Sequence, residues 1–291
     1  MNEKEKQIFV IDSSQLSDWD LCHYKFSLRH IMNDGRGLSP IVREHSLDIG
    51  IVMHELLRVY YFLKKRGGIS HERIVEATIR RGRRFLSNSS DLSAEDGAFA
   101  LLTFKEYTDY YKRETWIPQE VELPFVKKVF EDENFVFLIQ GRVDLIIKIP
   151  GLSDMIIVDH KTRSRFRVES KLDNQKLIYS KFLGMDTFLI NKIGLFKTKP
   201  PKEKFLRDDP ISYSEDYIEE WYQELIMTFK EIIAYKKLGF YKRNPSSCDK
   251  WSGCVFKQWC NEEPKRRSGL INMTYKVGEI WDVGKGLEKR K

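Results

Sequence analysis

The segment GRVDLIIKIPGLSDMIIVDHK, residues 141–161, holds two apolar runs separated by a Pro-Gly turn. Runs rich in Val and Ile that flank such a turn are typical of a β-hairpin. A turn centred on the junction of residues 151 and 152 places Asp144 opposite Asp159. Opposed residues have Cβ atoms about 4.5–5.5 Å apart, so the pattern predicts two carboxylates that meet among apolar strands. A bulge would shift this register by one residue.

Two like charges at this separation need a compensating charge. A divalent cation supplies it, and carboxylate oxygens suit Mg²⁺ or Mn²⁺. Side chains alternate along a strand, so Asp159 and Lys161 share one face while His160 points to the other. Lys161 can then orient or deprotonate a water molecule and offset charge on a phosphate. The alternative is two solvated aspartates at the strand ends and an exposed lysine.

Helical patterns surround the hairpin and set the fold class. Residues 46–65 have the apolar spacing of an amphipathic helix, which ends at Gly67 and Gly68. Residues 119–149 are dense in Val, Ile and Phe and are predicted to be strands. We therefore expect an α/β protein whose short mixed central sheet is flanked by helices. Further helices are predicted at residues 14–30, 71–87, 94–114, 172–186 and 214–238.

The composition excludes several classes of protein. Among the 291 residues, 41% are hydrophobic and 32% are charged, which is typical of a globular chain and not of a disordered one. No stretch approaches the roughly 18 apolar residues of a membrane span, and the N-terminus lacks an apolar signal core. We expect a cytoplasmic protein, prokaryotic or viral, without a membrane partner. The net charge of +7 fits either a polyanion partner or a merely basic protein.

Four short motifs follow one another in the chain: G-x-x-x-H at Gly50–His54, G-x-x-D at Gly141–Asp144, D-x-K at Asp159–Lys161 and Q-x-x-x-Y at Gln175–Tyr179. With these motifs in this order, the sequence resembles the PD-(D/E)XK nuclease superfamily in its RecB-like branch. That branch includes the CRISPR-associated RecB-like exonucleases and the nuclease domains of AddAB helicase–nucleases. The resemblance covers roughly residues 12–262.

This resemblance implies a restriction-endonuclease-like core at about 119–190 and a helical insert at about 67–115. Both belong to a single domain over residues 1–265, followed by a basic extension at 266–291. It also implies that the terminal regions, which carry the cysteines, are joined together.

The resemblance also implies roles for single residues. Lys161 looks like the catalytic lysine, acting with Asp144 and Asp159. The implied metal ligands are His54, Asp144, Asp159 and the backbone carbonyl of His160. Gln175 and Tyr179 are four residues apart, so they share a helix face and can meet the substrate. The alternative for His54 is an ordinary core or surface histidine, and the alternative for Gln175 and Tyr179 is a surface residue and a core residue of one helix. Glu55 and Glu122 are secondary acidic candidates for the site.

The four cysteines are Cys22, Cys248, Cys254 and Cys260. Such clustering in a cytoplasmic protein favours a metal site over disulfides. In members of the family with an iron–sulfur cluster, one upstream and three downstream cysteines hold [4Fe–4S], which implies the same role for these four. The spacing C-x5-C-x5-C departs from the usual C-x2-C-x5-C. A four-cysteine zinc site or free thiols remain alternatives.

The implied activity is that of a Mg²⁺- or Mn²⁺-dependent deoxyribonuclease, an exonuclease acting on single strands or duplex ends. It would serve recombination, repair, phage DNA processing or CRISPR adaptation. The chain has no P-loop, so a helicase would be a separate partner, as would a recombination or CRISPR protein. Arg80 and Arg84 are predicted to contact DNA phosphates, with a solvated helix surface as the alternative. A structure-specific or restriction-type endonuclease and a non-catalytic DNA-binding scaffold subunit are the other candidates.

Overall fold

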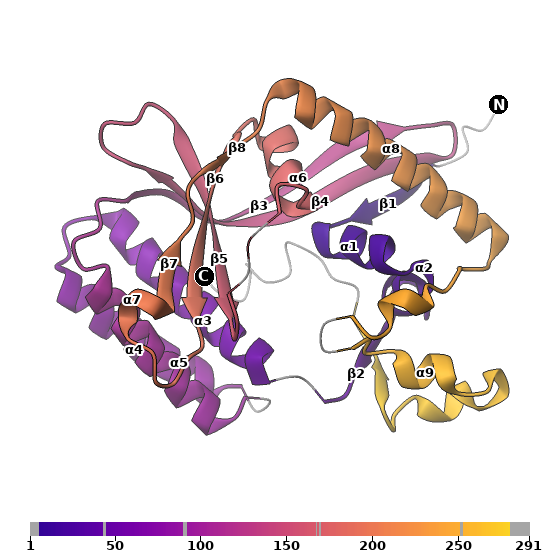
Figure 1. Cartoon of the computed structure of the whole chain (residues 1–291), viewed down its shortest axis with the longest axis horizontal. Helices are drawn as coiled ribbons and strands as arrows, with labels where there is room; N and C mark the ends of the chain where they lie inside the picture. Colours follow the sequence, from indigo (N-terminus) through magenta and orange to yellow (C-terminus); the bar gives the residue numbers. More distant parts are fainter. Residues whose placement is uncertain are drawn as a thin grey trace. The chain divides into compact units, whose positions relative to one another are not determined.

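The computed structural model describes residues 6–42, 45–89, 92–166, 168, 170–250 and 253–279. Its elements are drawn in Figure 1. The chain forms two compact units, each built from segments that are distant in sequence. Unit 1 comprises residues 1–42, 124–141 and 216–291, and unit 2 comprises residues 43–123 and 142–215.

Two long strands, β3 (Ile117–Glu131) and β4 (Phe135–Lys148), contribute residues to both units. In unit 2, β5 (Met155–Arg163) pairs antiparallel with the end of β4 and parallel with β6 (Thr187–Gly194). Two short strands, β7 (Phe205–Arg207) and β8 (Ile211–Ser212), pair antiparallel with β6. The sheet of unit 2 is therefore mixed, as the sequence predicts.

The predicted hairpin register is confirmed. Leu145 lies opposite Val158, and Lys148 lies opposite Met155. Gly151 has φ 90°, a conformation that glycine adopts without a steric cost, and it stands at the predicted turn. One step beyond the paired residues, this register brings Asp144 to the level of Asp159.

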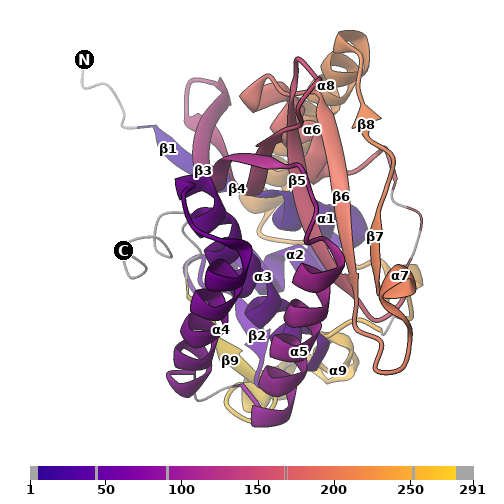
Figure 2. The same cartoon turned by 90° about the vertical axis from the view of Figure 1, so that its left-hand side faces the viewer.

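Three helices cover one face of this sheet, namely α3 (His45–Arg66), α4 (His71–Ser87) and α5 (Ala94–Tyr110). Figure 2 shows the three helices side by side at the front, with β6 to their right. Their apolar side chains share one core with alternate residues of the strands, such as Leu145, Val158 and Leu189. The short helix α7 (Pro201–Lys204) leads into β7.

A fourth helix, α6 (Asn174–Leu183), packs on the opposite side, where the ring of Tyr179 stacks on that of Phe188 at 6.4 Å. Its last residue precedes Gly184, which has φ 65° and caps the helix in the left-handed conformation. A mixed central sheet flanked by helices is the architecture that the sequence predicts.

Unit 1 gathers both ends of the described chain. The strand β1 (Gln7–Ile11) pairs in parallel with the start of β4, and β2 (Leu38–Pro40) pairs antiparallel with β9 (Tyr275–Val277). Phe229 of the long helix α8 (Glu215–Leu238) packs against Phe137. The remaining elements are α1 (Ser13–Leu21), α2 (His23–Phe26), the π-helical η1 (Ser27–Ile31), η2 (Pro245–Ser247), α9 (Lys257–Asn261) and η3 (Pro264–Leu270).

Several elements differ from the sequence prediction. The helix expected at 14–30 is broken at Cys22, whose backbone is extended. The strands β1, β2 and β9 are not among the predicted elements, and each pairs with a segment that is distant in sequence. Residues 266–279 of the predicted extension form part of η3 and β9, and Tyr275 is fully buried. Residues 280–291 lie outside the described part of the chain.

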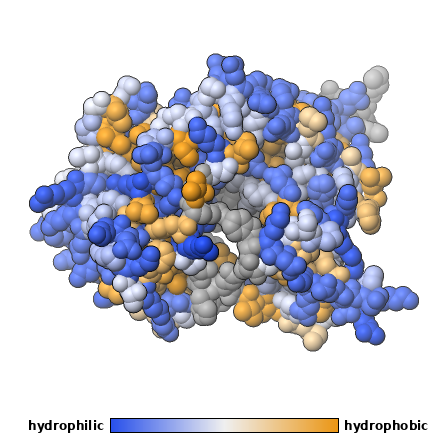
Figure 3. All heavy atoms as spheres, viewed as in Figure 1, coloured by the Kyte–Doolittle hydropathy of each residue, from blue (hydrophilic) through white to orange (hydrophobic). Residues whose placement is uncertain are grey.

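The surface is mainly hydrophilic on the face that Figure 3 draws, where hydrophobic residues occur in small scattered groups. Among the described residues, no helix is both long and apolar enough to cross a membrane.

Candidate metal centre

The carboxylate of Asp144 lies where the hairpin ladder ends. Its Oδ2 accepts a hydrogen bond from the backbone N–H of His160 at 2.9 Å. The same oxygen lies 3.6 Å from Nδ1 of His54. Strand β5 and helix α3 therefore both deliver groups to this one carboxylate.

Three side chains form a cluster with the dimensions of a metal site. One ligand atom from each of His54, Glu122 and Asp144 lies within 4.8 Å of the other two. The cluster offers two carboxylates and one imidazole. Carboxylate oxygens are ligands that Mg²⁺ and Mn²⁺ prefer, and an imidazole nitrogen also binds divalent transition metals. The residues present therefore fit a divalent cation.

Helix α3 reaches the sheet closely enough to place His54 because residue 50 is glycine. A Cβ atom at Gly50 would lie 3.0 Å from Oγ1 of Thr162, on β5. Gly50 precedes His54 by about one helical turn, so both residues stand on the same face of α3. The G-x-x-x-H spacing thus has a steric reason in the structure.

Glu122 joins the cluster through an unusual backbone conformation. Its φ is 53°, in the left-handed region that a residue with a Cβ rarely adopts. The carboxylate of Glu122 also accepts a hydrogen bond from Arg142 at 3.4 Å. The sequence marks Glu122 only as a secondary candidate, because a hydrophobic strand pattern does not show where such a conformation occurs.

Lys161 belongs to a second, adjoining set of polar contacts that leads to α6. Its Nζ lies 2.8 Å from Oδ2 of Asp159 and donates to Oε1 of Gln175 at 2.8 Å. Gln175 in turn donates from Nε2 to Oδ1 of Asp159 and to the hydroxyl of Tyr179, each at 3.1 Å. The Tyr179 hydroxyl donates to the carbonyl of Arg142 at 2.7 Å. The D-x-K and Q-x-x-x-Y motifs therefore meet in space.

The pKa shifts show which charges are balanced. Burial raises the pKa of Asp144 to about 6, and the charges of Asp159 and Glu122 add to the effect, while His54 opposes it. Burial alone would lower the pKa of Lys161, but the charge and hydrogen bond of Asp159 outweigh it and the pKa is raised. Lys161 is thus protonated and paired, whereas Asp144 lacks a full compensating cation.

The other predicted site residues lie outside the cluster of His54, Glu122 and Asp144. Asp159 lies in the Lys161 network and outside the cluster of three ligands. Glu55 receives two hydrogen bonds from Arg58, at 2.6 and 2.8 Å. Arg80 and Arg84 are exposed on α4, and among the described residues neither has a polar partner in the cluster.

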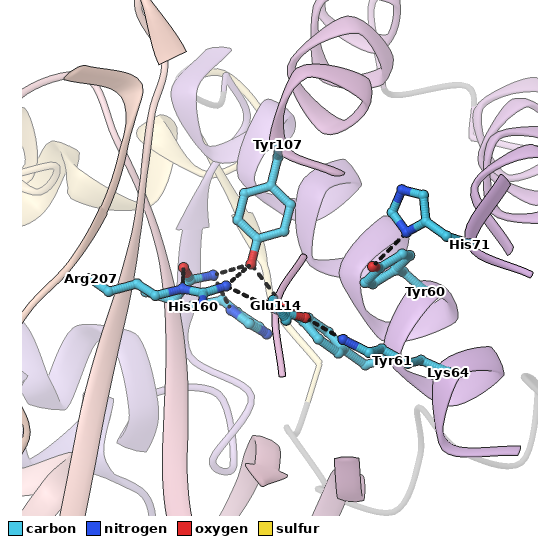
Figure 4. A network of polar contacts seen from close by, with 9 residues as sticks. Tyr60, Tyr61, Lys64, His71, Tyr107, Glu114, His160 and Arg207 are labelled. Atoms are coloured by element: carbon cyan, nitrogen blue, oxygen red, sulfur yellow. Dashed lines mark hydrogen bonds and ion pairs between the residues drawn. The ribbon is translucent and has the colours of Figure 1, made fainter. Parts of the chain in front are cut away.

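The side chain of His160 points away from Lys161, as the strand alternation predicts, and enters a buried polar network that the sequence does not reveal. Figure 4 shows Tyr107, Glu114 and Arg207 converging beside His160, with Tyr61 and Lys64 of α3 on the other side. Asn191, on β6, links this network to Nδ1 of His160 at 2.8 Å. These residues come from distant segments, so no local pattern predicts that they meet.

All four cysteines lie in unit 1, and the charges of other cysteines act on Cys248 and Cys260. The backbone N–H of Asn244 donates to Sγ of Cys22 at 3.3 Å, and the side chain of Asn244 donates to the Leu21 carbonyl. The N–H of Cys254 donates to the Cys248 carbonyl at 2.8 Å. Burial raises the pKa of the Cys260 thiol, and the charges of the other three cysteines add to this effect against that of Arg243. All four thiols are free, and thiolates are ligands that suit a soft metal.

No protein-family model matches the sequence, and no curated protein sequence is significantly similar to it. Solved structures that are similar include the crystal structure of SSO0001, with TM-score 0.35 and 15% identity over 72% of this chain and 84% of that chain. A "Putative exonuclease" from Eubacterium rectale has TM-score 0.44 and 13% identity over 82% and 86% of the two chains. LHK-Exo in complex with dAMP has TM-score 0.33 and 12% identity over 66% and 96%. Because these TM-scores are low, the function below is inferred from the site alone.

Proposed function

We propose that this protein is a Mg²⁺- or Mn²⁺-dependent nuclease that hydrolyses phosphodiester bonds of DNA, as an exonuclease on single strands or duplex ends. The observation that supports the proposal is the cluster of His54, Glu122 and Asp144 beside a protonated Lys161. The cluster has an excess of negative charge that a divalent cation would balance, and Lys161 offers a positive charge for a phosphate. Asp159 and the carbonyl of His160 are proposed as further ligands.

The residues of the chain then have distinct tasks. A bound cation would polarise the scissile phosphate and favour ionisation of the attacking water. Lys161, which is held by Gln175, offsets charge that builds up on the phosphate oxygens. Tyr179 anchors Gln175 to the backbone of Arg142 and so keeps the lysine in place. The leaving group is the 3′ oxygen, and the product carries a 5′ phosphate.

The decisive experiment uses end-labelled single- and double-stranded DNA with Mn²⁺. Wild type should release labelled nucleotides, and Lys161→Ala should lower the rate by at least about 100-fold. Lys148→Ala, which removes an exposed lysine from the same hairpin, is the matched control and should cleave like wild type. An inert wild type, as expected of a scaffold subunit, or an active Lys161→Ala would contradict the proposal. Cleavage of closed circular DNA would show that the protein is an endonuclease and not an exonuclease.

We propose that Arg80 and Arg84 bind the DNA backbone. They are four residues apart on one exposed face of α4, where arginine can follow phosphates. Replacing both by Ala should weaken DNA binding for all sequences and reduce the slope of log K against log salt by about 2. An unchanged slope would leave them as a solvated helix surface.

We propose that Cys22, Cys248, Cys254 and Cys260 hold a [4Fe–4S] cluster that ties the ends of unit 1 together. The proposal is supported by four free thiols in one unit and by the N–H of Asn244, which donates to Sγ of Cys22. An anaerobic preparation should be brown, contain iron and sulfide, and lose its colour in Cys22→Ser. Zinc in a colourless protein, or no metal, would contradict the cluster.

Partners and pathway are also proposals. The chain lacks an ATP-driven motor motif, so a helicase or a recombination or CRISPR protein would act with it as a separate chain. Affinity purification from cells that express a tagged Lys161→Ala variant tests this.

A further inference from the structure

The imidazole of His160 is deeply buried, and the proposed mechanism does not use it. Only 3% of the residue is exposed. Its ring stacks on that of Tyr61, with centroids 5.5 Å apart and planes 12° apart. The ring therefore has one fixed orientation, and its two nitrogens can be assigned different roles.

Arg207 distinguishes the oxygen of the Asn191 amide from its nitrogen, because a guanidinium can only donate hydrogen bonds. Its Nε donates to Oδ1 of Asn191 at 3.4 Å, which identifies that atom as the amide oxygen. Arg207 is itself immobilised by its ion pair with Glu114 and by the rings of Tyr111 and Trp116, which lie 3.6 and 3.5 Å from its guanidinium carbon.

The amide nitrogen of Asn191 carries two hydrogens, and both are used. One is donated to the hydroxyl of Tyr107 at 3.0 Å and the other to Nδ1 of His160 at 2.8 Å. Nδ1 is consequently an acceptor without a proton. A neutral imidazole has one N–H group, so its proton is on Nε2.

The Nε2–H group of His160 has no hydrogen-bond partner among the described residues. A buried donor left without a partner destabilises the fold, and such a donor needs an explanation. Asn191 approaches the ring from β6, so Nε2 lies on the side of the ring that faces away from β6. On that side of β5 are β4 with Asp144, whose carboxylate binds the backbone N–H of His160, and α3 with His54, whose ring centroid is 6.3 Å away.

We propose that Nε2–H of His160 donates a hydrogen bond to an oxygen atom bound beside the cluster of His54, Glu122 and Asp144. The oxygen comes either from water or from a DNA phosphate. His160 is then a binding residue of the site, and its orientation is set by the chain of contacts from Glu114 through Arg207 and Asn191. This inference deepens the proposed nuclease function and rests on it for the identity of the phosphate.

Nuclear magnetic resonance of protein with ¹⁵N-labelled histidine rings tests the proposal without measuring activity. The His160 signals, identified by their loss in His160→Gln, should show the Nε2–H tautomer in metal-free protein. The Nε2 proton should shift on adding Mg²⁺ alone if water is the acceptor, and only on adding Mg²⁺ with thymidine 5′-monophosphate if phosphate is. A proton on Nδ1, or a signal that moves in neither titration, would overturn the proposal.

Two substitutions separate hydrogen bonding from packing. His160→Gln places an amide N–H near the position of Nε2. His160→Asn has a shorter side chain, which reaches only the position of Nδ1 and keeps only the contact with Asn191. Glutamine should retain at least about tenfold more cleavage than asparagine at saturating DNA, with similar unfolding temperatures. Equal losses would reduce His160 to a packing role. If wild type cuts no DNA, the proposed function fails, while the nuclear magnetic resonance titration with Mg²⁺ and nucleotide still decides the role of His160.

Discussion

Unit 2 contains two carboxylates with opposite surroundings, the buried Glu114 and the partly buried Asp144. The side chain of Glu114 is 1% exposed, forms a 2.7 Å ion pair with Lys64 and a second ion pair with Arg207, and receives the hydroxyl of Tyr61. Asp144 accepts one hydrogen bond from a backbone N–H, and Nδ1 of His54 lies 3.6 Å from its carboxylate. A buried charge is tolerated when it is paired. Glu114 is therefore fully paired within the fold, whereas the residues around Asp144 balance its negative charge only in part.

The largest effect on stability should follow from removing the negative charge of Glu114. Glu114→Gln leaves Lys64 and Arg207 without their counter-ion, and loss of one partner from a buried pair costs about 3–5 kcal/mol. Urea denaturation measures it. The matched control is Glu120→Gln, which breaks the half-exposed pair with Lys65 and should cost no more than about 1 kcal/mol. Equal costs for both variants would remove the distinction between Glu114 and a surface acid.

Asp144, whose charge is balanced only in part, should behave in the opposite way. The pKa of Asp144 is raised from 3.8 to about 6 by burial, so the stability linked to its proton is present below about pH 4 and is lost as the pH rises through 6. Over this range the metal-free wild type should lose up to about 3 kcal/mol relative to Asp144→Asn. Denaturation curves in a chelator at pH 4 and pH 7.5 test this. A pH-independent difference between the two proteins would show that Asp144 is not an uncompensated charge.

Protons should also compete with the cation for Asp144. Below the pKa of about 6, the apparent affinity for Mg²⁺ should fall by about tenfold for each unit of pH, because one proton must leave before the ion binds. Calorimetric titration between pH 5 and pH 7.5 gives this slope. An affinity that does not change over this range would place the cation elsewhere.

The smallest effect concerns the approach of α3 to β5. In Gly50→Ala the new Cβ would meet Oγ1 of Thr162 at 3.0 Å, which should move His54 away from Asp144 and lower the cation affinity by about threefold to tenfold, or about 1 kcal/mol. The double variant with Thr162→Ala removes the contact and should restore binding. If the double variant binds no better than Gly50→Ala, the loss has another cause.

Part of this arrangement follows from local sequence. Apolar periodicity predicts α4 at 71–87, and the Pro-Gly turn predicts the hairpin register that opposes Leu145 to Val158. Strand alternation then separates His160 from Lys161. These features depend on neighbours in sequence, so the pattern alone determines them.

Other features depend on contacts between distant segments. The strand β6 contains Asn191 and Lys192, two buried polar residues that interrupt an apolar pattern, and their reason lies in partners elsewhere in the chain. Glu122 enters the cluster through a positive φ, which no residue preference signals. Such positions are predicted poorly because a functional site breaks the local rules that the rest of the fold obeys.

The most direct test of the central claim is a calorimetric titration of metal-free protein with Mn²⁺ at pH 7.5, comparing wild type, Asp144→Asn and Glu122→Gln. We predict saturable binding to wild type, with affinity reduced by at least about tenfold in each variant, as expected when a ligand of one ion is removed. Binding that is absent from wild type, or as tight in both variants as in wild type, would contradict the assignment of His54, Glu122 and Asp144 as a metal centre.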